Sequence, residues 1–309
     1  MIIVVDLNPS LDRTLTVAKL EAATVNRAHT VRLDPGGKGL NVARALSGWG
    51  LPVLAMALLG GGTGQTMARL LEREEVPCDT VLIEGETRSN ITIIDEAKNT
   101  YIKVNEAGPV VTLEELDALE DRILSRVSRG DLWVLSGRLP LGAPLDTMAR
   151  LIHLVQSGGA RALLDTTGRA LHLGIGARPF LVKPNLAEAQ ELAGRPLEAE
   201  ADIVAFVRNL WTRNIRAVAV TRSARGAILG YQGTIVEAVP PEVPVVGPVG
   251  SGDAAMAALA WGILEGLRPP EMARLAVAAG TATAMVEGTG MAPLNMVQEM
   301  RSKVQVRVL

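Results

Sequence analysis

The strongest constraint on the fold is the alternation of short, wholly apolar runs with longer amphipathic ones along the 309 residues. A strand that is apolar throughout is covered on both faces, which is typical of a parallel sheet between two helical layers. The apolar runs lie at residues 2–7, 53–58, 132–136, 162–165, 180–183, 217–221 and 227–230. The helical segments lie at residues 42–47, 65–73, 113–127, 145–156, 203–213, 254–264 and 271–286. The sequence therefore predicts an α/β fold, a three-layer α/β/α sandwich with a mostly parallel central sheet.

Two segments, at about residues 12–35 and 87–104, interrupt this alternation and are rich in Thr, Val, Ile and Asn. Within the second, residues 91–94 and 101–104 bracket a polar turn and predict a β-hairpin. Small β excursions of this kind often form lids over a site, although an extension of the main sheet's edge is the alternative. The chain shows no repeat and no low-complexity linker, so one domain spanning residues 1–309 is expected.

Composition excludes several classes of partner. The formal net charge of -2 and the aromatic content of 3% give no basis for binding nucleic acid or an anionic membrane. The single cysteine, Cys78, cannot form an internal disulfide and is interpreted as a small buried apolar residue. No signal peptide and no apolar run of about 20 residues is apparent, so a cytoplasmic protein is expected.

A glycine-rich turn, Val-Gly-Ser-Gly-Asp at residues 249–253, precedes an Ala-rich helical run. Glycines permit close approach of the backbone to a ligand, and the free amides and dipole of a helix start attract phosphate oxygens. Asp253 could accept a proton from an alcohol while the amides of the turn hold the group being transferred. That arrangement is typical of a phosphoryl transferase.

The same turn also matches the dinucleotide-binding fingerprint, but a single match of this kind is weak. The preceding segment, residues 240–244, is broken by prolines where that fingerprint needs a strand. Glu271, the acid at about the right distance, follows two prolines at an expected helix start. A dehydrogenase is therefore disfavoured, whereas a simple helix cap remains an alternative for Asp253.

A second glycine-rich turn, Asp-Pro-Gly-Gly-Lys-Gly-Leu-Asn-Val-Ala, lies at residues 34–43. Lys38 supplies a mobile cation, and Asn41 offers both a donor and an acceptor at a helix start. Because Gly39 follows Lys38 where a P-loop requires Ser or Thr, this turn is not a P-loop.

With these two turns, the chain resembles the ribokinase-like (PfkB) carbohydrate kinases. Within that family it is most similar to the branch of 1-phosphofructokinases and tagatose-6-phosphate kinases, which act on phosphorylated ketohexoses. The shared motifs occur in order over nearly the whole length, at residues 8–12, 36–43, 85–88, 105–109, 135–137, 164–166, 183–188 and 250–253. The resemblance implies a single ribokinase-like domain with a small β-sheet lid.

The resemblance also implies roles for residues that would hold the sugar substrate. Asp253 would be the general base, and the amides of Gly250, Ser251 and Gly252 would form an anion hole. Asp12, Gly37 and Asn41 would bind sugar hydroxyls, while Arg88 and Lys38, assisted by Arg27 and Ser136, would bind the phosphate already on the substrate. The planar guanidinium of Arg88 suits a phosphate better than a neutral sugar and is the main reason to expect a phosphosugar.

On the nucleotide side, the resemblance implies a cluster of Lys183, Asn185 and Glu188, the last two orienting Mg²⁺ through water. Thr221, Ser223 and Gly226 would border the triphosphate and ribose, with Val277 and Thr281 near the adenine. Simple helix packing is the alternative for the last two. ATP and Mg²⁺ are the implied cofactors, and use of a monovalent cation stays open.

The implied reaction is ATP-dependent phosphorylation of fructose 1-phosphate, tagatose 6-phosphate or fructose 6-phosphate to the bisphosphate, by a homodimer paired through its lid strands. A kinase for an unphosphorylated sugar or a nucleoside, or a non-catalytic protein that binds sugar phosphates, is the alternative. Three departures from the family pattern leave the sugar open. They are Gly247-Pro248 before the turn, Ser251 in place of the commoner Ala, as in tagatose-6-phosphate kinases, and Arg138 where Ser is usual.

Overall fold

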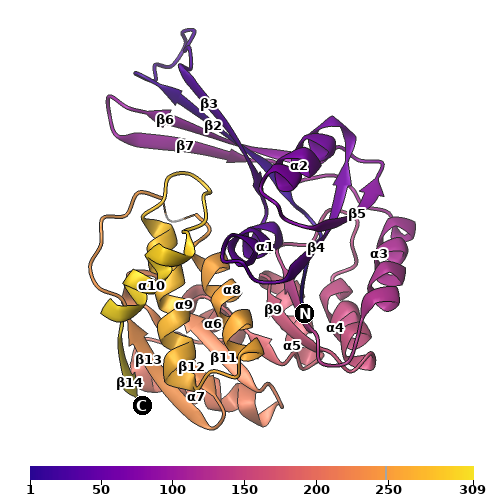
Figure 1. Cartoon of the computed structure of the whole chain (residues 1–309), viewed down its shortest axis with the longest axis vertical. Helices are drawn as coiled ribbons and strands as arrows, with labels where there is room; N and C mark the ends of the chain where they lie inside the picture. Colours follow the sequence, from indigo (N-terminus) through magenta and orange to yellow (C-terminus); the bar gives the residue numbers. More distant parts are fainter. Residues whose placement is uncertain (248) are drawn as a thin grey trace.

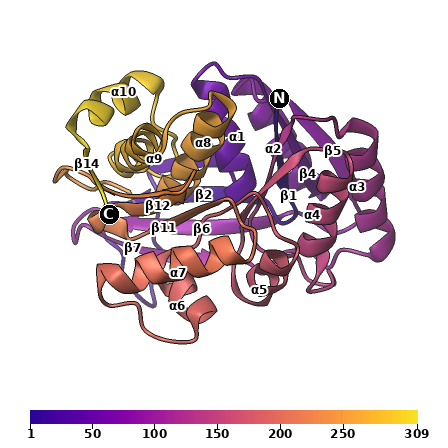
Figure 2. The same cartoon turned by 90° about the horizontal axis from the view of Figure 1, so that it is seen from below.

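The computed structural model describes residues 1–247 and 249–309 and confirms the predicted three-layer arrangement. A ten-stranded sheet with the strand order β14-β13-β12-β11-β10-β9-β8-β1-β4-β5 lies between two helical layers (Figures 1 and 2). Its strands are β1 (Ile2–Asp6), β4 (Val53–Gly60), β5 (Cys78–Ile83), β8 (Leu132–Ser136), β9 (Arg161–Asp165), β10 (Leu181–Val182), β11 (Ala217–Thr221), β12 (Ala227–Tyr231), β13 (Thr234–Val239) and β14 (Gln305–Val308).

Each face of this sheet carries its own hydrophobic core. Ile2 and Val4 of β1 pack into one core, and Ile3 and Val5 into the other, which explains why the strand is apolar throughout. The first core is covered by α1 (Lys38–Gly48), α2 (Gly61–Arg73), α8 (Ser251–Leu264), α9 (Pro269–Ala284) and α10 (Leu294–Lys303). The second is covered by α3 (Leu113–Arg126), α4 (Thr147–Ser157), α5 (Gly168–Gly176), α6 (Leu186–Ala193) and α7 (Glu200–Thr212).

The sheet is mostly parallel, as predicted, and one end of it is antiparallel. The run at residues 227–230 forms β12, which pairs antiparallel with β11, and β13 and β14 continue antiparallel. Only residues 222–226 connect β11 to β12, and a parallel pair would need a much longer crossover. The remaining strands, from β11 to β5, pair in parallel as predicted.

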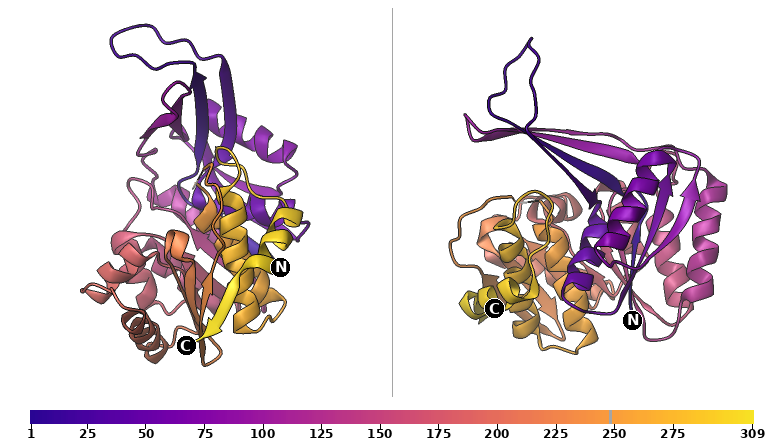
Figure 3. Two further views of the ribbon diagram at one scale, coloured as in Figure 1. Left: turned by 90° about the vertical axis from the view of Figure 1, so that its left-hand side faces the viewer. Right: turned by 45° about the horizontal axis from the view of Figure 1, so that its top comes forward.

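The two strand-like excursions form a separate four-stranded sheet with the order β3-β2-β6-β7, rather than an extension of the main sheet's edge. The predicted hairpin is confirmed, because β6 and β7 pair antiparallel. This sheet projects from the α/β body (Figures 1 and 3). Its strands are β2 (Ser10–Val17), β3 (Thr30–Gly36), β6 (Arg88–Asp95) and β7 (Thr100–Asn105).

The start of α1 is fixed to the end of β1 by a buried carboxylate. Asp6 Oδ2 accepts hydrogen bonds from the amides of Gly39 and Leu40 at 2.9 and 3.2 Å. Gly37, the residue before the helix, has φ +110°, and a Cβ there would lie 2.4 Å from Asp6 Oδ2. The turn therefore requires glycine, and Asp6 satisfies amides that an N-cap side chain would otherwise bind.

Cys78 begins the edge strand β5 and is half-buried rather than fully buried. Burial raises the pKa of its thiol to about 11, so the thiol is protonated at neutral pH. Across residues 1–247 and 249–309, none of the helices combines the length and the hydropathy needed to span a membrane.

Candidate functional site

The two glycine-rich turns, far apart in the sequence, meet beside the carboxyl ends of the central parallel strands. In that position open α/β sheets form ligand sites. Helix α8 begins at Ser251, directly after Gly250, whose φ of +83° is left-handed. Asn41, in α1, donates from Nδ2 to Asp253 Oδ2 at 2.9 Å. The start of α1 and the start of α8 are thus joined through one buried hydrogen bond.

Asp253 lies in the first turn of α8 but does not cap the helix. The N-cap position is Gly250, and no side-chain cap hydrogen bond is made there. The Asp253 side chain is only 7% exposed and turns toward Asn41 instead. The helix-cap interpretation of this carboxylate is therefore not supported, and its burial needs another explanation.

Burial and the neighbouring carboxylate of Asp165 raise the pKa of Asp253 to about 6. The hydrogen bond from Asn41 and the ammonium groups of Lys38 and Lys183 act in the opposite direction. Asp253 is consequently ionised at neutral pH and a stronger base than a solvated aspartate. A base of this kind, beside free helix amides, has the properties needed to receive a proton during group transfer.

Asp165 is the main residue of this site to which the sequence assigned no individual role. It lies at the end of β9, in register with Ser136 of β8 and, through it, with Asp6 of β1. Its Oδ2 pairs with Lys183 Nζ at 2.8 Å, and its Oδ1 pairs with Lys38 Nζ at 3.1 Å. Its place at the carboxyl end of a parallel strand was the signal that could have identified it.

Burial favours protonated Asp165, but the ammonium groups of Lys183 and Lys38 outweigh it and hold its pKa below the ordinary value. Asp165 in turn raises the pKa of Lys38. The Lys183 ammonium lies next to Gly252, since a Cβ there would be 3.7 Å from Nζ. One carboxylate therefore holds two cations close to the start of α8, where an anion would be stabilised.

Asp12 lies at the base of the smaller sheet, in β2. Its Oδ1 accepts hydrogen bonds from Asn90 Nδ2 at 2.7 Å and from Ser10 Oγ at 3.0 Å. Gly36 packs against the same carboxylate, and a Cβ there would lie 2.5 Å from Asp12 Oδ2. The sequence did not predict a site role for Asn90. It lies two residues after Arg88 on a strand, so the two side chains lie on the same face.

Arg88 lies beside Asn8, in a partly buried position. Its Nε and Nη2 both donate to the carbonyl oxygen of Asn8, at 3.1 and 2.9 Å, and its Nη1 donates to the Glu106 carbonyl at 3.2 Å. It also lines a cavity of about 620 Å³ between residues 84–88 and 106–115. The guanidinium is therefore held in a fixed orientation by backbone groups.

Two serine hydroxyls of the predicted site are buried without a partner. Ser136 Oγ and Ser251 Oγ make no hydrogen bond within the described part of the chain. A buried hydroxyl that bonds to nothing is costly, so such groups are often completed by a ligand.

Arg27 is not brought to the other predicted residues of its own chain. It lies in segment 18–29, which joins β2 to β3 at the far end of the smaller sheet and projects from the molecule (Figure 3). The eight residues of β2 separate that end from Ser10 at the base. At about 3.3 Å per residue this separation exceeds 20 Å.

The nucleotide-side cluster is built on the start of α6. Asn185 Oδ1 accepts from the Glu188 amide at 2.9 Å, and Glu188 Oε2 accepts from the Asn185 amide at 2.8 Å. Asn185 also pairs with Thr221 in an isolated bridge, which brings the two predicted segments together. The residues described by the structure contain no cluster of three or more His, Cys, Asp or Glu side chains around one point.

The turn after β11 is tight. Ser223 has φ +53°, and Gly226 has φ +73° with the Ala238 carbonyl 2.0 Å from where its Cβ would lie. On α9, Val277 is buried, and Thr281 Oγ1 donates to the Val277 carbonyl at 2.7 Å. These contacts fit the helix-packing alternative for Val277 and Thr281, and their place near adenine stays a prediction. Of the Gly247-Pro248 departure, Pro248 lies outside the described residues.

Comparisons with known proteins agree with this geometry. The model of the pfkB family carbohydrate kinases matches residues 1–295. A 1-phosphofructokinase of Rhodobacter capsulatus is 37% identical over 89% of this chain and 87% of its own. A tagatose-6-phosphate kinase of Staphylococcus epidermidis is 31% identical over 99% of each chain.

Solved structures give the same result. A crystal structure of phosphofructokinase-2 from Escherichia coli in complex with potassium superposes with a TM-score of 0.93 at 30% identity, covering 97% of this chain and 98% of that one. The chain belongs to the pfkB family of carbohydrate kinases.

Proposed function

We propose that this protein transfers the terminal phosphoryl group of ATP to a ketohexose monophosphate, giving the bisphosphate. Fructose 1-phosphate, tagatose 6-phosphate and fructose 6-phosphate are the candidate acceptors. The observation that carries the proposal is the buried carboxylate of Asp253, held by Asn41 at the glycine-rich start of α8. The names of the relatives, 1-phosphofructokinase and tagatose-6-phosphate kinase, support a phosphorylated ketohexose.

In this proposal Asp253 accepts the proton of the attacking hydroxyl while the oxygen bonds to the γ-phosphorus and the bond to ADP breaks. The amides of Gly250, Ser251 and Gly252, with the α8 dipole, bind the charge that develops on the phosphoryl oxygens. A pKa of about 6 is far below that of an alcohol, so proton transfer comes late. Positioning and charge stabilisation therefore contribute more than basicity.

Lys183 would reinforce the anion hole from its place beside Gly252. Asn185 and Glu188 would contact, through water, the Mg²⁺ that accompanies ATP, an ion that neutralises phosphate charge when bound. Thr221, Ser223 and Gly226 would border the triphosphate and ribose, with Val277 and Thr281 nearest the adenine.

At the acceptor end, Asp12, Gly37 and Asn41 would bind sugar hydroxyls, and Arg88, Lys38 and Ser136 the phosphate. The smaller sheet would act as a lid that excludes water. Arg138, the departure from the family pattern, is exposed just after β8. Asn8 accepts from Arg88 and donates to the carbonyl of Leu139, the residue that follows Arg138, so the Arg138 backbone lies near this contact. We assign Arg138 to the same phosphate site.

The reaction is tested by ADP release across a panel of ketohexose phosphates, with fructose, ribose and adenosine as unphosphorylated controls. We expect turnover with at least one phosphate and loss of about 10²- to 10⁴-fold in Asp253→Asn, which keeps the shape but not the base. Nucleotide binding by the variant should be largely retained. More than a tenth of wild-type turnover in the variant would rule out Asp253 as the base.

The pattern across the panel also separates the alternatives. Turnover confined to unphosphorylated acceptors would identify a sugar or nucleoside kinase instead. Sugar-phosphate binding without ADP release from any member of the panel would indicate a non-catalytic protein of the same fold.

The turnover number should fall with acid, because protonated Asp253 cannot accept the hydroxyl proton. With a pKa raised to about 6, activity is present above that pH and decreases about tenfold per unit below it. Asn41→Ala is the control, because the bond from Asn41 lowers this pKa. In Asn41→Ala the loss of activity in acid should occur at higher pH than in the wild-type protein. If it occurred at the same pH, the loss would be due to titration of the substrates and not of Asp253.

Arg88→Ala should raise the Michaelis constant for the phosphorylated acceptor about 10- to 150-fold, since a hydrogen bond to a charged group contributes about 1.5–3 kcal/mol. The constant for ATP should stay within about twofold. The matched control is Arg208→Ala, an exposed arginine of α7 outside both the site and the smaller sheet. Equal increases for the two substrates would refute the phosphate role of Arg88.

We also propose a homodimer through the lid. Strand register places Leu15, Val31, Leu33, Ile91, Ile93, Ile102 and Val104 on one face, opposite the face of Asp12 and Asn90. Ile102 and Val104 are more than half exposed, and an apolar face of this extent is typical of an interface.

Sedimentation equilibrium should report twice the mass of one chain, and Ile102→Lys should shift the protein toward a monomer. Leu82→Lys, at a 79% exposed apolar residue on the main-sheet edge β5, should leave the dimer intact. A monomeric wild-type protein would contradict the assembly.

A further inference from the structure

We propose that Arg44 is a positioning residue that sets the orientation of Asn41 and, through it, of Asp253. The inference rests on the proposed role of Asp253 as the base. Arg44 lies in α1, one turn after Asn41, and therefore on the same face of the helix. It was not among the residues that the sequence pattern marked as functional.

The Arg44 side chain is only 6% exposed, so its charge requires strong partners. One side of the guanidinium is bound bidentately by Glu74, with Nε to Oε2 at 2.6 Å and Nη2 to Oε1 at 2.9 Å. Glu74 follows the last turn of α2. Because a bidentate pair fixes the plane of the guanidinium, it also fixes where the remaining nitrogen points.

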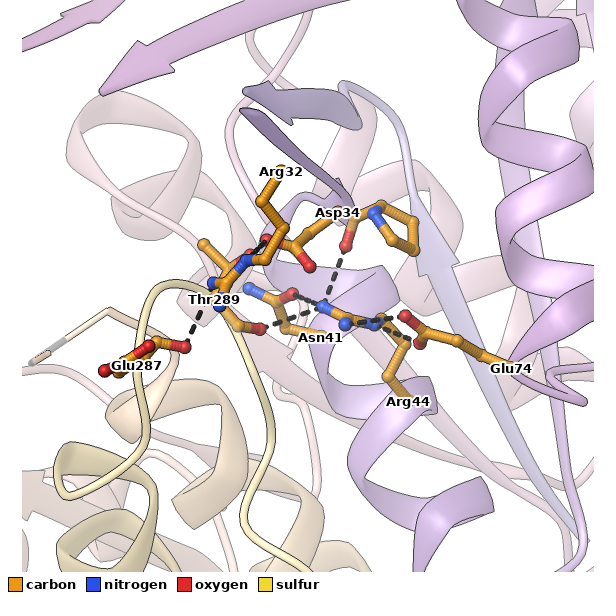
Figure 4. A network of polar contacts seen from close by, with 8 residues as sticks. Arg32, Asp34, Asn41, Arg44, Glu74, Glu287 and Thr289 are labelled. Atoms are coloured by element: carbon orange, nitrogen blue, oxygen red, sulfur yellow. Dashed lines mark hydrogen bonds and ion pairs between the residues drawn. The ribbon is translucent and has the colours of Figure 1, made fainter. Parts of the chain in front are cut away.

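That nitrogen, Nη1, faces three oxygens (Figure 4). It lies 2.9 Å from the Pro35 carbonyl, 3.0 Å from the Thr289 carbonyl and 3.3 Å from Asn41 Oδ1. Nη1 carries two hydrogens and no acceptor, so only an oxygen is favourable at each of these positions.

This donor determines which way the Asn41 amide is turned. With Oδ1 toward Arg44, the Nδ2 hydrogens face Asp253 Oδ2 at 2.9 Å. The reversed amide would place its NH₂ against the guanidinium and its oxygen against the carboxylate, which is unfavourable at both ends. Arg44 and Asp253 thus enforce one orientation of the same side chain from opposite sides.

The other two oxygens connect this arrangement to two further segments of the chain. Pro35 belongs to the lid strand β3, and Thr289 to the loop that follows α9. A second link joins the same strand and loop, because Arg32 Nη2 donates to the Glu287 carbonyl at 3.0 Å while its Nε binds Asp34 (Figure 4). The Arg44 contact that orients Asn41 therefore also depends on the positions of the lid strand and of this loop.

The test is a double-mutant cycle on Arg44 and Asn41. Arg44→Met should lower the turnover number by about 10- to 100-fold, with the Michaelis constant for ATP within about twofold, since misplacing a catalytic group is costly in rate. In an Asn41→Ala background the same change should lower turnover by less than about twofold. Effects that multiply would show that Arg44 acts only as a structural cross-link.

Arg44→Lys separates positioning from stability. Lysine keeps a cation for Glu74 but lacks the second nitrogen that faces Asn41, Pro35 and Thr289, so the thermal midpoint should fall less than in Arg44→Met while turnover falls. Glu74→Gln removes the carboxylate that fixes the guanidinium plane, so it should lower turnover in the same direction as Arg44→Lys. In Arg44→Lys, the acid limb should move upward as in Asn41→Ala, with Asp165, Lys38 and Lys183 unchanged around Asp253. An unmoved limb would overturn the proposal.

A crystal structure of Arg44→Lys tests the inference independently of any reaction. The distance from Asn41 Nδ2 to Asp253 Oδ2 should increase from 2.9 Å to beyond hydrogen-bonding range. An unchanged distance would refute the positioning role. Absence of ADP release by the wild-type protein would instead refute the proposed reaction. The distance between Asn41 and Asp253 in the variant would still test the positioning role of Arg44.

Discussion

The geometry of the site depends on the carboxylate of Asp6, which fixes the first amides of α1 to the end of β1. A helix that begins without an N-cap side chain must satisfy these donors elsewhere, and here a strand of the main sheet does so. The positions of Lys38 and Asn41 are therefore fixed relative to β1 and to the strands that pair with it. A side chain at position 37 would collide with Asp6, so this close contact between the turn and β1 requires glycine.

Two buried carboxylates beside this helix start have pKa values displaced in opposite directions. Lys183 and Lys38 outweigh burial at Asp165 and keep it ionised, whereas burial and Asp165 itself raise the pKa of Asp253. Both lysines therefore form their ion pairs with Asp165 and not with Asp253. Separation of carboxylate pKa values by environment is how neighbouring acids take different roles. The permanent anion organises cations, and the other carboxylate is suited to receive a proton.

The sequence predicted the layers, most strands and the two glycine turns, because period and glycine placement are local properties. It missed α5, α6 and α10, which are short, and the antiparallel pairing of β12 and β13, whose connections are too short for a crossover, as well as the terminal strand β14. Asp165 could have been identified from its place at the end of the expected strand 162–165, whereas the contacts of Arg44 could not. One of the contacts of Arg44 is with the carbonyl of Thr289, which lies 245 positions further along the chain.

In the proposed function the smaller sheet serves both as a lid and as a dimer interface, and strand alternation would keep the two apart. Residues on one face of β2, β3, β6 and β7 include Asp12 and Asn90, while the intervening residues form the exposed apolar face. A one-residue shift of register would exchange these faces and lose both sets of contacts. The bonds from Asn90 to Asp12 and from Arg44 to Pro35 resist such a shift at the base of the sheet. Assembly on one face and acceptor binding on the other would then depend on the same register.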